Sequence, residues 1–287
     1  MKKVYEFLVW DNCNNNCQFC WQREKPRIYN VEKRKEILNE VLNFIRSDKF
    51  EVGSHILVCG GEIFDDVMPF DFLKDFFFHI SCLMYNDVID ILYLNTNLLT
   101  KNIDKVLNIL GEFEDKGLLE RIRFTTSYDV AGRFRDEESE KLMLQNLDWV
   151  RIYYPTMPTV VNMILTKPLC EKLLNEHNFL NDIMSVYKCW VNLIPYIVLD
   201  KNLTAPKKMI FQALMQVNED CPGYLQRYIP NMCILQEKWL YMYKDNEFQF
   251  CSCKVSEDCG HSVNFKKYCK EGTCFCCDLE EVFNVYM

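Results

Sequence analysis

The hydrophobic positions of the first two hundred residues alternate between two periods. Short runs of β-branched and aromatic residues are each followed by a longer segment whose apolar residues recur at helical spacing. The clearest helix is 31–48, in which Ile37, Val41, Phe44 and Ile45 share one face. The expected strands are 4–10, 55–59, 88–94, 121–127, 160–166 and 189–198, and the expected helices are 31–48, 70–85, 102–117, 135–150 and 169–180.

This order of elements predicts an α/β fold. Strand–helix units followed by a last strand favour parallel pairing in a barrel-like or doubly wound sheet. The pattern changes near residue 200, and nine of the sixteen cysteines fall at or beyond Cys221. We therefore expect an α/β domain over residues 1–200, a linker region over 201–228 and a small cysteine-rich module over 229–287.

Charge and hydropathy narrow the classes of partner. The formal net charge of −8 disfavours broad capture of nucleic acid, although a nucleotide or structured RNA in a local basic pocket stays possible. The apolar run at the N-terminus ends at Asp11, which is too short for a signal peptide or a spanning helix, and no later stretch is long enough to cross a membrane. We expect a soluble, cytoplasmic protein, in which so many cysteines indicate metal binding rather than disulfides.

Three cysteines follow the first expected strand in the segment "DNCNNNCQFCW". Cys13, Cys17 and Cys20 have the spacing C-x3-C-x2-C. Loops at the carboxyl ends of parallel strands form the reactive face of α/β folds. Three thiolates can hold three irons of a [4Fe–4S] cluster and leave the fourth iron open to a small molecule. A zinc site with a distant fourth ligand is the alternative.

A second motif, "GGE", follows the second expected strand. Gly60 and Gly61 permit close approach of the backbone to a ligand, and the carboxylate of Glu62 can receive an ammonium group. An ordinary turn is the alternative for this tripeptide alone. Its position on the same rim as the cysteine loop makes the pair of motifs specific.

Together, the two motifs resemble those of the radical S-adenosylmethionine (SAM) superfamily, over roughly residues 3–198. Asn14 and Phe19 also match the signature of that family. The resemblance implies a partial (βα)6 TIM-like barrel and an enzyme in which Cys13, Cys17 and Cys20 hold a [4Fe–4S] cluster. The amino and carboxylate groups of SAM would chelate the open iron. An external one-electron reductant would reduce the cluster, and SAM would cleave to methionine and a 5′-deoxyadenosyl radical that removes a hydrogen atom from the substrate.

The same resemblance suggests further contacts to SAM at later strand ends. It implies a SAM-binding segment after the third strand, ribose contacts after the fourth and within the fifth, and an arginine for the SAM carboxylate. The residues concerned are Asn95, Thr96 and Asn97 after the third strand, Ser127 and Asp129 with Arg133 or Arg135 after the fourth, and Asn162 in the fifth. The alternative for the first group is an ordinary Asn-rich turn. For the arginines it is a solvated surface position, and for Asn162 it is a buried polar residue of the strand.

The cysteine-rich tail resembles the opening of the SPASM and twitch extensions, which carry auxiliary iron–sulfur clusters. In those modules a cysteine precedes a hairpin and a second cysteine follows it; here Asn246 stands where glycine is usual at the turn. A structural zinc, with His261 as a candidate ligand, is the alternative, and the "CFCC" spacing departs from a two-cluster pattern. The expected ligands of one auxiliary [4Fe–4S] cluster are Cys233, Cys251, Cys269 and Cys274.

The sequence is compatible with three classes of function. The tail favours modification of a peptide or protein side chain, although no leader-peptide-binding domain is evident before the barrel. The alternative is modification or cyclisation of a nucleotide or nucleic-acid base, as in the cyclases of molybdopterin synthesis. Those cyclases usually end in Gly-Gly, whereas this sequence ends in FNVYM, which disfavours the alternative. A non-enzymatic metal-binding protein is the third class, and the GGE motif disfavours it.

Overall fold

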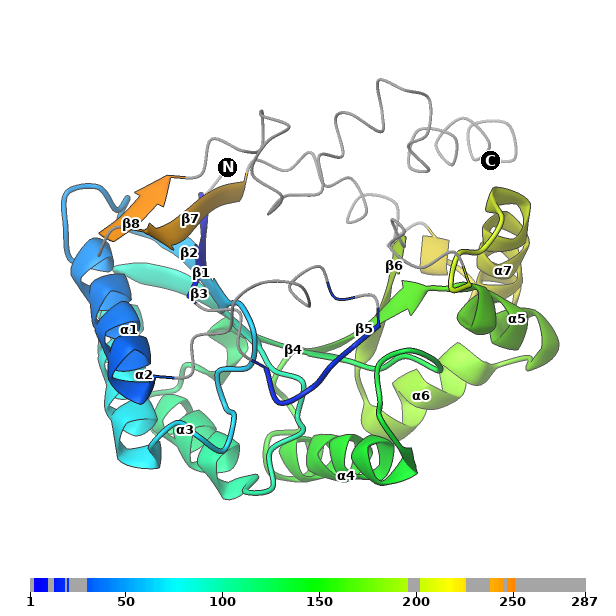
Figure 1. Cartoon of the computed structure of the whole chain (residues 1–287), viewed down its shortest axis with the longest axis horizontal. Helices are drawn as coiled ribbons and strands as arrows, with labels where there is room; N and C mark the ends of the chain where they lie inside the picture. The colour runs from blue at the N-terminus through cyan, green and yellow to red at the C-terminus, as the bar shows by residue number, and fades with distance from the viewer. Residues whose placement is uncertain are drawn as a thin grey trace. The chain divides into compact units, whose positions relative to one another are not determined.

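The computed structural model describes residues 3–9, 13–18, 20, 30–195, 202–225, 238–244 and 247–250 (Figure 1). These residues divide into two compact units. The first contains the described residues of 1–127, 134–160 and 238–251, and the second contains those of 128–133 and 161–237.

Parallel strands alternate with helices in the first unit. Strand β1 pairs with β2, β2 with β3 and β3 with β4, all in parallel, and α2 packs against both α1 and α3 (Figure 1). The strands are β1 (Val4–Leu8), β2 (Ser54–Cys59), β3 (Ile89–Asn95) and β4 (Ile122–Ser127). The helices are α1 (Val31–Ile45), α2 (Phe70–Tyr85), α3 (Asp104–Glu114), the short 3-10 helix η1 (Leu119–Arg121) and α4 (Glu137–Tyr153).

The core of the first unit follows from the alternation of side chains along these strands. Phe7, Ile56, Leu92, Leu94 and Phe124 are all fully buried, and they lie on paired strands of the sheet. The apolar faces of the helices cover them, because a one-sided apolar helix gains free energy only by packing on such a surface. The α1 residues that define the expected apolar stripe are buried as the spacing predicts.

A hairpin from the tail of the chain joins the first unit. Strand β7 (Lys238–Lys244) pairs in parallel with β1, and β8 (Glu247–Phe250) pairs antiparallel with β7. The hairpin expected between Cys233 and Cys251 is therefore present. Its strands extend the α/β sheet, and the expected module boundary at residue 229 stays a prediction, because most residues beyond it lie outside the described ones.

The second unit continues the alternation. It contains most of β5 (Thr159–Leu165), then α5 (Lys167–Asn175), α6 (Phe179–Tyr187), β6 (Trp190–Pro195) and α7 (Lys207–Asp220). Strands β5 and β6 are neighbours, and α5 packs against α7. The hydroxyl of Tyr224 donates to the main-chain oxygen of Val191 at 3.0 Å, and its ring stacks on Trp190.

The predicted fold class is confirmed: parallel strands alternate with helices as in a partial (βα)6 TIM-like barrel. Two expectations need correction. The segment 169–180 forms parts of two helices, because Asn178 adopts the left-handed conformation at a φ of 65° between α5 and α6. The segment 201–228, expected to be a linker, contains the 14-residue helix α7. Among the described residues, no helix is both long and apolar enough to span a membrane.

Candidate functional site

Three loops leave adjacent strand ends at one edge of the first unit. The parallel register pairs Leu8 with Cys59 and Val58 with Leu94, and the main-chain N–H of Val9 extends the ladder to the oxygen of Cys59 at 2.9 Å. The cysteine loop after β1, the GGE loop after β2 and the segment 96–100 after β3 therefore emerge side by side. This is the arrangement that the order of motifs predicts.

Glu62 joins the second of these loops to the third. Its side chain is buried, and its Oε1 accepts hydrogen bonds from Thr96 Oγ1 at 2.8 Å and from the main-chain N–H of Phe64 at 2.9 Å. Its Oε2 accepts from the main-chain N–H of Asn97 at 2.6 Å. Burial raises the pKa of this carboxyl to about 7, against the lowering effect of these donors.

Asn97 joins the third segment to the cysteine loop. Its side-chain nitrogen donates to Cys13 Sγ at 3.3 Å and to Asn14 Oδ1 at 2.7 Å. Asn14 in turn donates through Nδ2 to the main-chain oxygen of Leu99 at 3.2 Å. A continuous set of hydrogen bonds thus runs from the first cysteine to the buried carboxylate of Glu62.

The three cysteines of the loop after β1 differ in burial. Cys17 is buried, Cys13 and Cys20 are half-buried, and the N–H of Cys20 donates to the oxygen of Cys17 at 3.1 Å. Burial raises the pKa of the Cys13 thiol to about 12, and the negative charges of Glu62, Cys17 and Cys20 act in the same direction. A metal cation bound to these sulfurs would reverse that preference, because metal-bound thiols are deprotonated.

A [4Fe–4S] cluster fits the chemistry of this loop. The side-chain nitrogen Nδ2 of Asn15 is buried without a hydrogen-bond partner among the described residues, so the loop holds a donor available to an additional acceptor. Within the described part of the chain, no three Cys, His, Asp or Glu side chains surround one common ion position. A cluster does not require such convergence, since each thiolate binds a different iron.

Two features hold the GGE loop in its conformation: the backbone torsion of Gly60 and an ion pair with a residue of α1. Gly60 adopts a φ of 147°, a conformation that residues with a Cβ rarely adopt. The loop is supported from α1, where the fully buried Arg34 donates through Nη1 to Asp65 Oδ2 at 2.6 Å. The other oxygen of Asp65 accepts from the N–H of Met68 at 3.2 Å. The sequence did not predict this ion pair. The one indication of it in the sequence is the position of Arg34 on the apolar face of the helix.

Three of the predicted SAM contacts belong to the second unit. Asp129 is buried and accepts hydrogen bonds from Arg133 Nε and from the N–H of Ile164. Burial raises the pKa of Asp129, and the charge of Arg133 opposes that shift. Asn162 accepts through Oδ1 from Asn192 Nδ2 at 3.1 Å, and its main-chain oxygen accepts from the N–H of Tyr128 at 3.0 Å. Their roles in SAM binding stay predictions.

The remaining predicted residues are placed as follows. Asn95 and Ser127 are the last residues of β3 and β4, both half-buried. Arg135, the alternative to Arg133, donates through Nη2 to the main-chain oxygen of Asn14 at 3.1 Å. The expected tail ligands lie outside the described residues: Cys233, Cys251, Cys269, Cys274 and the alternative His261.

Two residues near the strand ends were not anticipated. Asn146 on α4 donates through Nδ2 to the main-chain oxygens of Leu98 and Thr100, both at 2.9 Å, and thereby holds the segment after β3. The thiol of Cys59, the last residue of β2, donates to Glu6 Oε1 at 3.5 Å. Asn146 offers no local signal, because a single asparagine in an amphipathic helix is ordinary.

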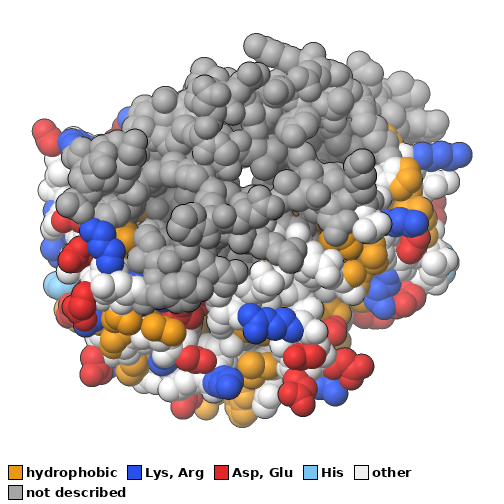
Figure 2. Space-filling view, viewed as in Figure 1, with side chains coloured by type: hydrophobic (Ala, Val, Ile, Leu, Met, Phe, Trp, Pro, Cys, Tyr) orange, Lys and Arg blue, Asp and Glu red, His pale blue; other side chains and the backbone are white. Residues whose placement is uncertain are grey.

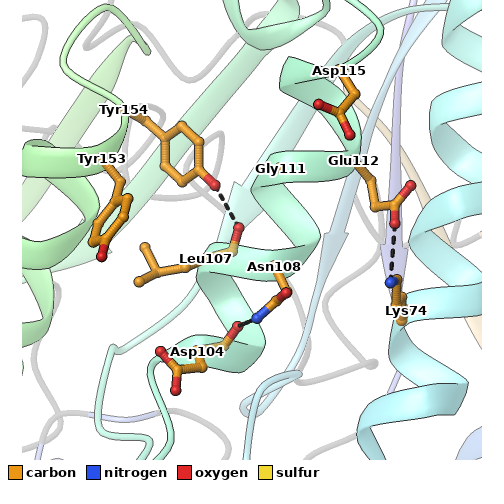
Figure 3. Close-up of a pocket in the computed structure, with 9 residues that line it drawn as sticks. All are labelled: Lys74, Asp104, Leu107, Asn108, Gly111, Glu112, Asp115, Tyr153 and Tyr154. Carbon is orange, nitrogen blue, oxygen red and sulfur yellow. Dashed lines mark hydrogen bonds and ion pairs between the residues drawn. The ribbon is translucent and has the colours of Figure 1, made fainter.

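A separate hollow of about 450 Å³ lies on the outer side of α3 (Figure 3). Lys74 and Glu112 form an ion pair at 3.3 Å on its wall, and the hydroxyl of Tyr154 donates to the main-chain oxygen of Leu107 at 2.6 Å. Its lining residues belong to none of the three loops described above.

Comparisons with known proteins give matches among solved structures only. No protein-family model matches the chain, and no curated protein matches it. A structure of anSMEcpe with bound SAM and a Cp18Cys peptide matches at 12% identity and a TM-score of 0.59, over 90% of this chain and 76% of that one. Another anSMEcpe structure with bound SAM matches at 13% identity and a TM-score of 0.55, over 78% and 62%.

A structure of SuiB from Streptococcus suis bound to SAM matches at 14% identity and a TM-score of 0.48, over 79% of this chain and 48% of that one. The chain thus spans less than two thirds of the SuiB chain and of the second anSMEcpe chain. At these identities the likeness to anSMEcpe concerns the fold. The chain therefore has the fold of structures that hold SAM, as its resemblance to the radical SAM superfamily implies.

Proposed function

We propose that this chain is a radical SAM enzyme that cleaves SAM reductively and abstracts a hydrogen atom from its substrate. The observation that carries the proposal is the continuous hydrogen-bonded connection from Cys13 through Asn97 to Glu62. It holds together the two motifs on which the resemblance rests, although 49 positions separate Cys13 from Glu62 in the sequence. The fold shared with SAM-bound structures supports the same conclusion.

Each residue of the proposed site has a defined task. Cys13, Cys17 and Cys20 would hold the cluster, which when bound supplies one electron and an open iron for the amino and carboxylate groups of SAM. Glu62 would receive the SAM ammonium, because a buried carboxylate makes a strong charge-assisted hydrogen bond. Gly60 and Gly61 would let the backbone approach that ligand, and Thr96 would orient the carboxylate of Glu62.

The raised pKa of Glu62 fits this task. Burial brings the pKa to about 7 in the protein alone. An ammonium group beside the carboxylate favours its ionised form and would lower that pKa again. The site would therefore recover, on binding SAM, part of the free energy that burial of the carboxylate costs.

A peptide or protein side chain is the substrate class that we propose. One of the matching structures holds a Cp18Cys peptide together with SAM, and the hairpin β7–β8 is present where the resemblance to SPASM and twitch extensions begins. On the described part of the face in Figure 2, lysine and arginine side chains are interspersed with aspartate and glutamate, which offers no broad basic surface for nucleic acid. An auxiliary cluster on Cys233, Cys251, Cys269 and Cys274 belongs to this proposal.

The test is SAM cleavage by anaerobically reconstituted protein under a strong one-electron reductant. The expected products are 5′-deoxyadenosine and methionine, formed slowly even without substrate. Cys17→Ala should abolish both products, whereas Cys82→Ala on α2 is the matched control and should change neither. Methyl transfer as the sole fate of SAM would overturn the proposal.

A further inference from the structure

The side chain of Asn97 uses all of its hydrogen-bonding groups between the cysteine loop and its own segment. Its Nδ2 donates to Cys13 Sγ at 3.3 Å and to Asn14 Oδ1 at 2.7 Å, while its Oδ1 accepts from the N–H of Leu99 at 2.8 Å. A primary amide has two N–H groups and one oxygen. Cys13 Sγ therefore takes one of the two N–H donors that Asn97 possesses, beside the main-chain N–H of Asn15 at 3.4 Å.

The orientation of the Asn97 amide follows from two neighbouring main-chain groups, one of which can only donate a hydrogen bond and the other only accept one. Leu99 N–H can only donate, so it requires the oxygen of Asn97. The main-chain oxygen of Leu99 can only accept, so it requires the nitrogen of Asn14 and leaves the Asn14 oxygen directed to Asn97. Both constraints place the nitrogen of Asn97, and not its oxygen, against Cys13 Sγ.

The segment that carries Asn97 is itself held in place. Leu98 is fully buried in the left-handed conformation at a φ of 55°, which is unusual for a residue with a branched side chain. Its N–H donates to Thr96 Oγ1 at 3.1 Å, and its oxygen accepts from Asn146 Nδ2 at 2.9 Å. The donor to Cys13 is thus fixed before any ligand arrives, as strained segments at functional sites often are.

We propose that Asn97 is a positioning residue that makes the cluster on Cys13 easier to reduce, an inference that rests on the proposed function. A hydrogen bond to a ligating sulfur stabilises negative charge on it, and the reduced cluster carries more of that charge than the oxidised one. The bond therefore raises the reduction potential. This assigns Asn97 to the electron-accepting step, in addition to the SAM contact predicted from the sequence.

The experiment compares midpoint potentials of reconstituted Asn97→Ala, Asn97→Asp and Asn146→Ala with that of the parent protein, without SAM. The reporter is the electron paramagnetic resonance signal that Cys17→Ala abolishes, which isolates this cluster from any other. Asn97→Ala removes the donor and keeps the main-chain bond to Glu62. Asn97→Asp also keeps an acceptor for Leu99, so it guards against loss of the loop conformation. Asn146→Ala loosens the same segment without touching a sulfur.

The potential should fall in Asn97→Ala by the equivalent of an approximately tenfold change in the reduction equilibrium, or about 59 mV for a one-electron couple. It should fall further in Asn97→Asp, which adds a negative charge, and clearly less in Asn146→Ala, which loosens the segment but keeps the donor. An unchanged potential in both Asn97 variants, or an equal fall in Asn146→Ala, would overturn the inference. In either case a parent protein that still cleaves SAM would leave the proposed function intact.

Discussion

The carboxylate of Glu62 and the main-chain N–H of Asn97 lie 2.6 Å apart, in a hydrogen bond that joins the loop after β2 to the segment after β3. Because Asn97 also contacts Cys13, a change at Glu62 reaches both the proposed ammonium site and the cysteine loop. Substitutions here must therefore separate loss of charge from loss of a structural hydrogen bond.

Glu62→Gln should lower the affinity for SAM while leaving the iron content unchanged. A charge-assisted hydrogen bond contributes about 1.5–3 kcal/mol, so the affinity should fall roughly 10- to 150-fold. Because the amide nitrogen of the introduced glutamine would face a hydrogen-bond donor, some stability should be lost as well. SAM titration of the reconstituted variant measures the effect.

Thr96→Val is the matched control for this substitution. It removes one donor to Glu62 Oε1 and the acceptor of the Leu98 N–H, but keeps the negative charge. It should cost about 1–3 kcal/mol of stability and change SAM affinity far less than Glu62→Gln. Equal losses of affinity in the two variants would show that Glu62 acts through the loop structure and not through its charge.

Glu62 should contribute a share of the stability of the SAM-free protein that is lost as pH rises from about 4.5 to about 7. Burial raises the pKa of Glu62 from its ordinary value of 4.5 to about 7 in the folded chain. Between these values the folded state binds more protons than the unfolded state, so the free energy of unfolding decreases with pH. The contribution is on the order of 3 kcal/mol at most.

Urea unfolding at pH 5 and pH 8, with the parent protein compared to Glu62→Gln, isolates this contribution. As pH rises, the free energy of unfolding of the parent protein should fall relative to that of Glu62→Gln, because glutamine does not ionise. Saturating SAM should reduce the shift, since its ammonium favours the ionised carboxylate. A pH-independent difference would contradict the buried, raised-pKa state of Glu62.

The sequence was sufficient to predict the three converging loops, but not the side chains that hold them. Parallel strands bring their carboxyl ends to one edge, so motifs placed directly after β1, β2 and β3 must meet there. Arg34 and Asn146 reach that edge from helices, and their partners are 31 and 48 residues away in the sequence. Such long-range polar contacts have no local pattern from which to infer them.

Asn97 illustrates an intermediate case. Its position after β3 was sufficient to expect a polar role at the site. The particular bond to Cys13 depends on the left-handed turn at Leu98, and nothing in a leucine predicts a positive φ. The break between α5 and α6 is different, because asparagine is among the residues that tolerate this conformation, and Asn178 could have been recognised as a helix boundary.

The ion pair between Arg34 and Asp65 should behave as a buried pair. Arg34→Met leaves the Asp65 carboxylate buried without its cationic partner, which should destabilise the protein by about 3–5 kcal/mol. The double variant Arg34→Met with Asp65→Asn should recover part of that loss, since no isolated charge remains. Lys33→Ala on the same helix, which breaks an exposed pair with Glu36, should cost less than about 1 kcal/mol. Chemical denaturation of the four proteins tests the set.

Replacement of glycine by alanine should have opposite effects at two positions. Gly60→Ala forces a side chain into a φ of 147° and should destabilise the GGE loop by about 1–3 kcal/mol, with weaker SAM binding. Gly111 lies within α3, where an added Cβ would meet the Tyr154 hydroxyl at 3.4 Å, an ordinary contact (Figure 3). Gly111→Ala should therefore stabilise the protein by up to about 1 kcal/mol. Thermal unfolding that ranks the two variants in the reverse order would contradict both assignments.

The iron content should separate the cluster at the strand ends from the one proposed in the tail. Reconstituted protein should bind more than about four irons per chain if both clusters form, since each [4Fe–4S] cluster holds about four. The triple change of Cys13, Cys17 and Cys20 to Ala should leave the content of the tail cluster, and the matching change of Cys233, Cys251, Cys269 and Cys274 should leave that of the first. Full iron content in the first variant would disprove the N-terminal assignment. Zinc that stays bound to the tail cysteines after iron reconstitution would favour a structural zinc site, and not an iron–sulfur cluster, in the cysteine-rich module.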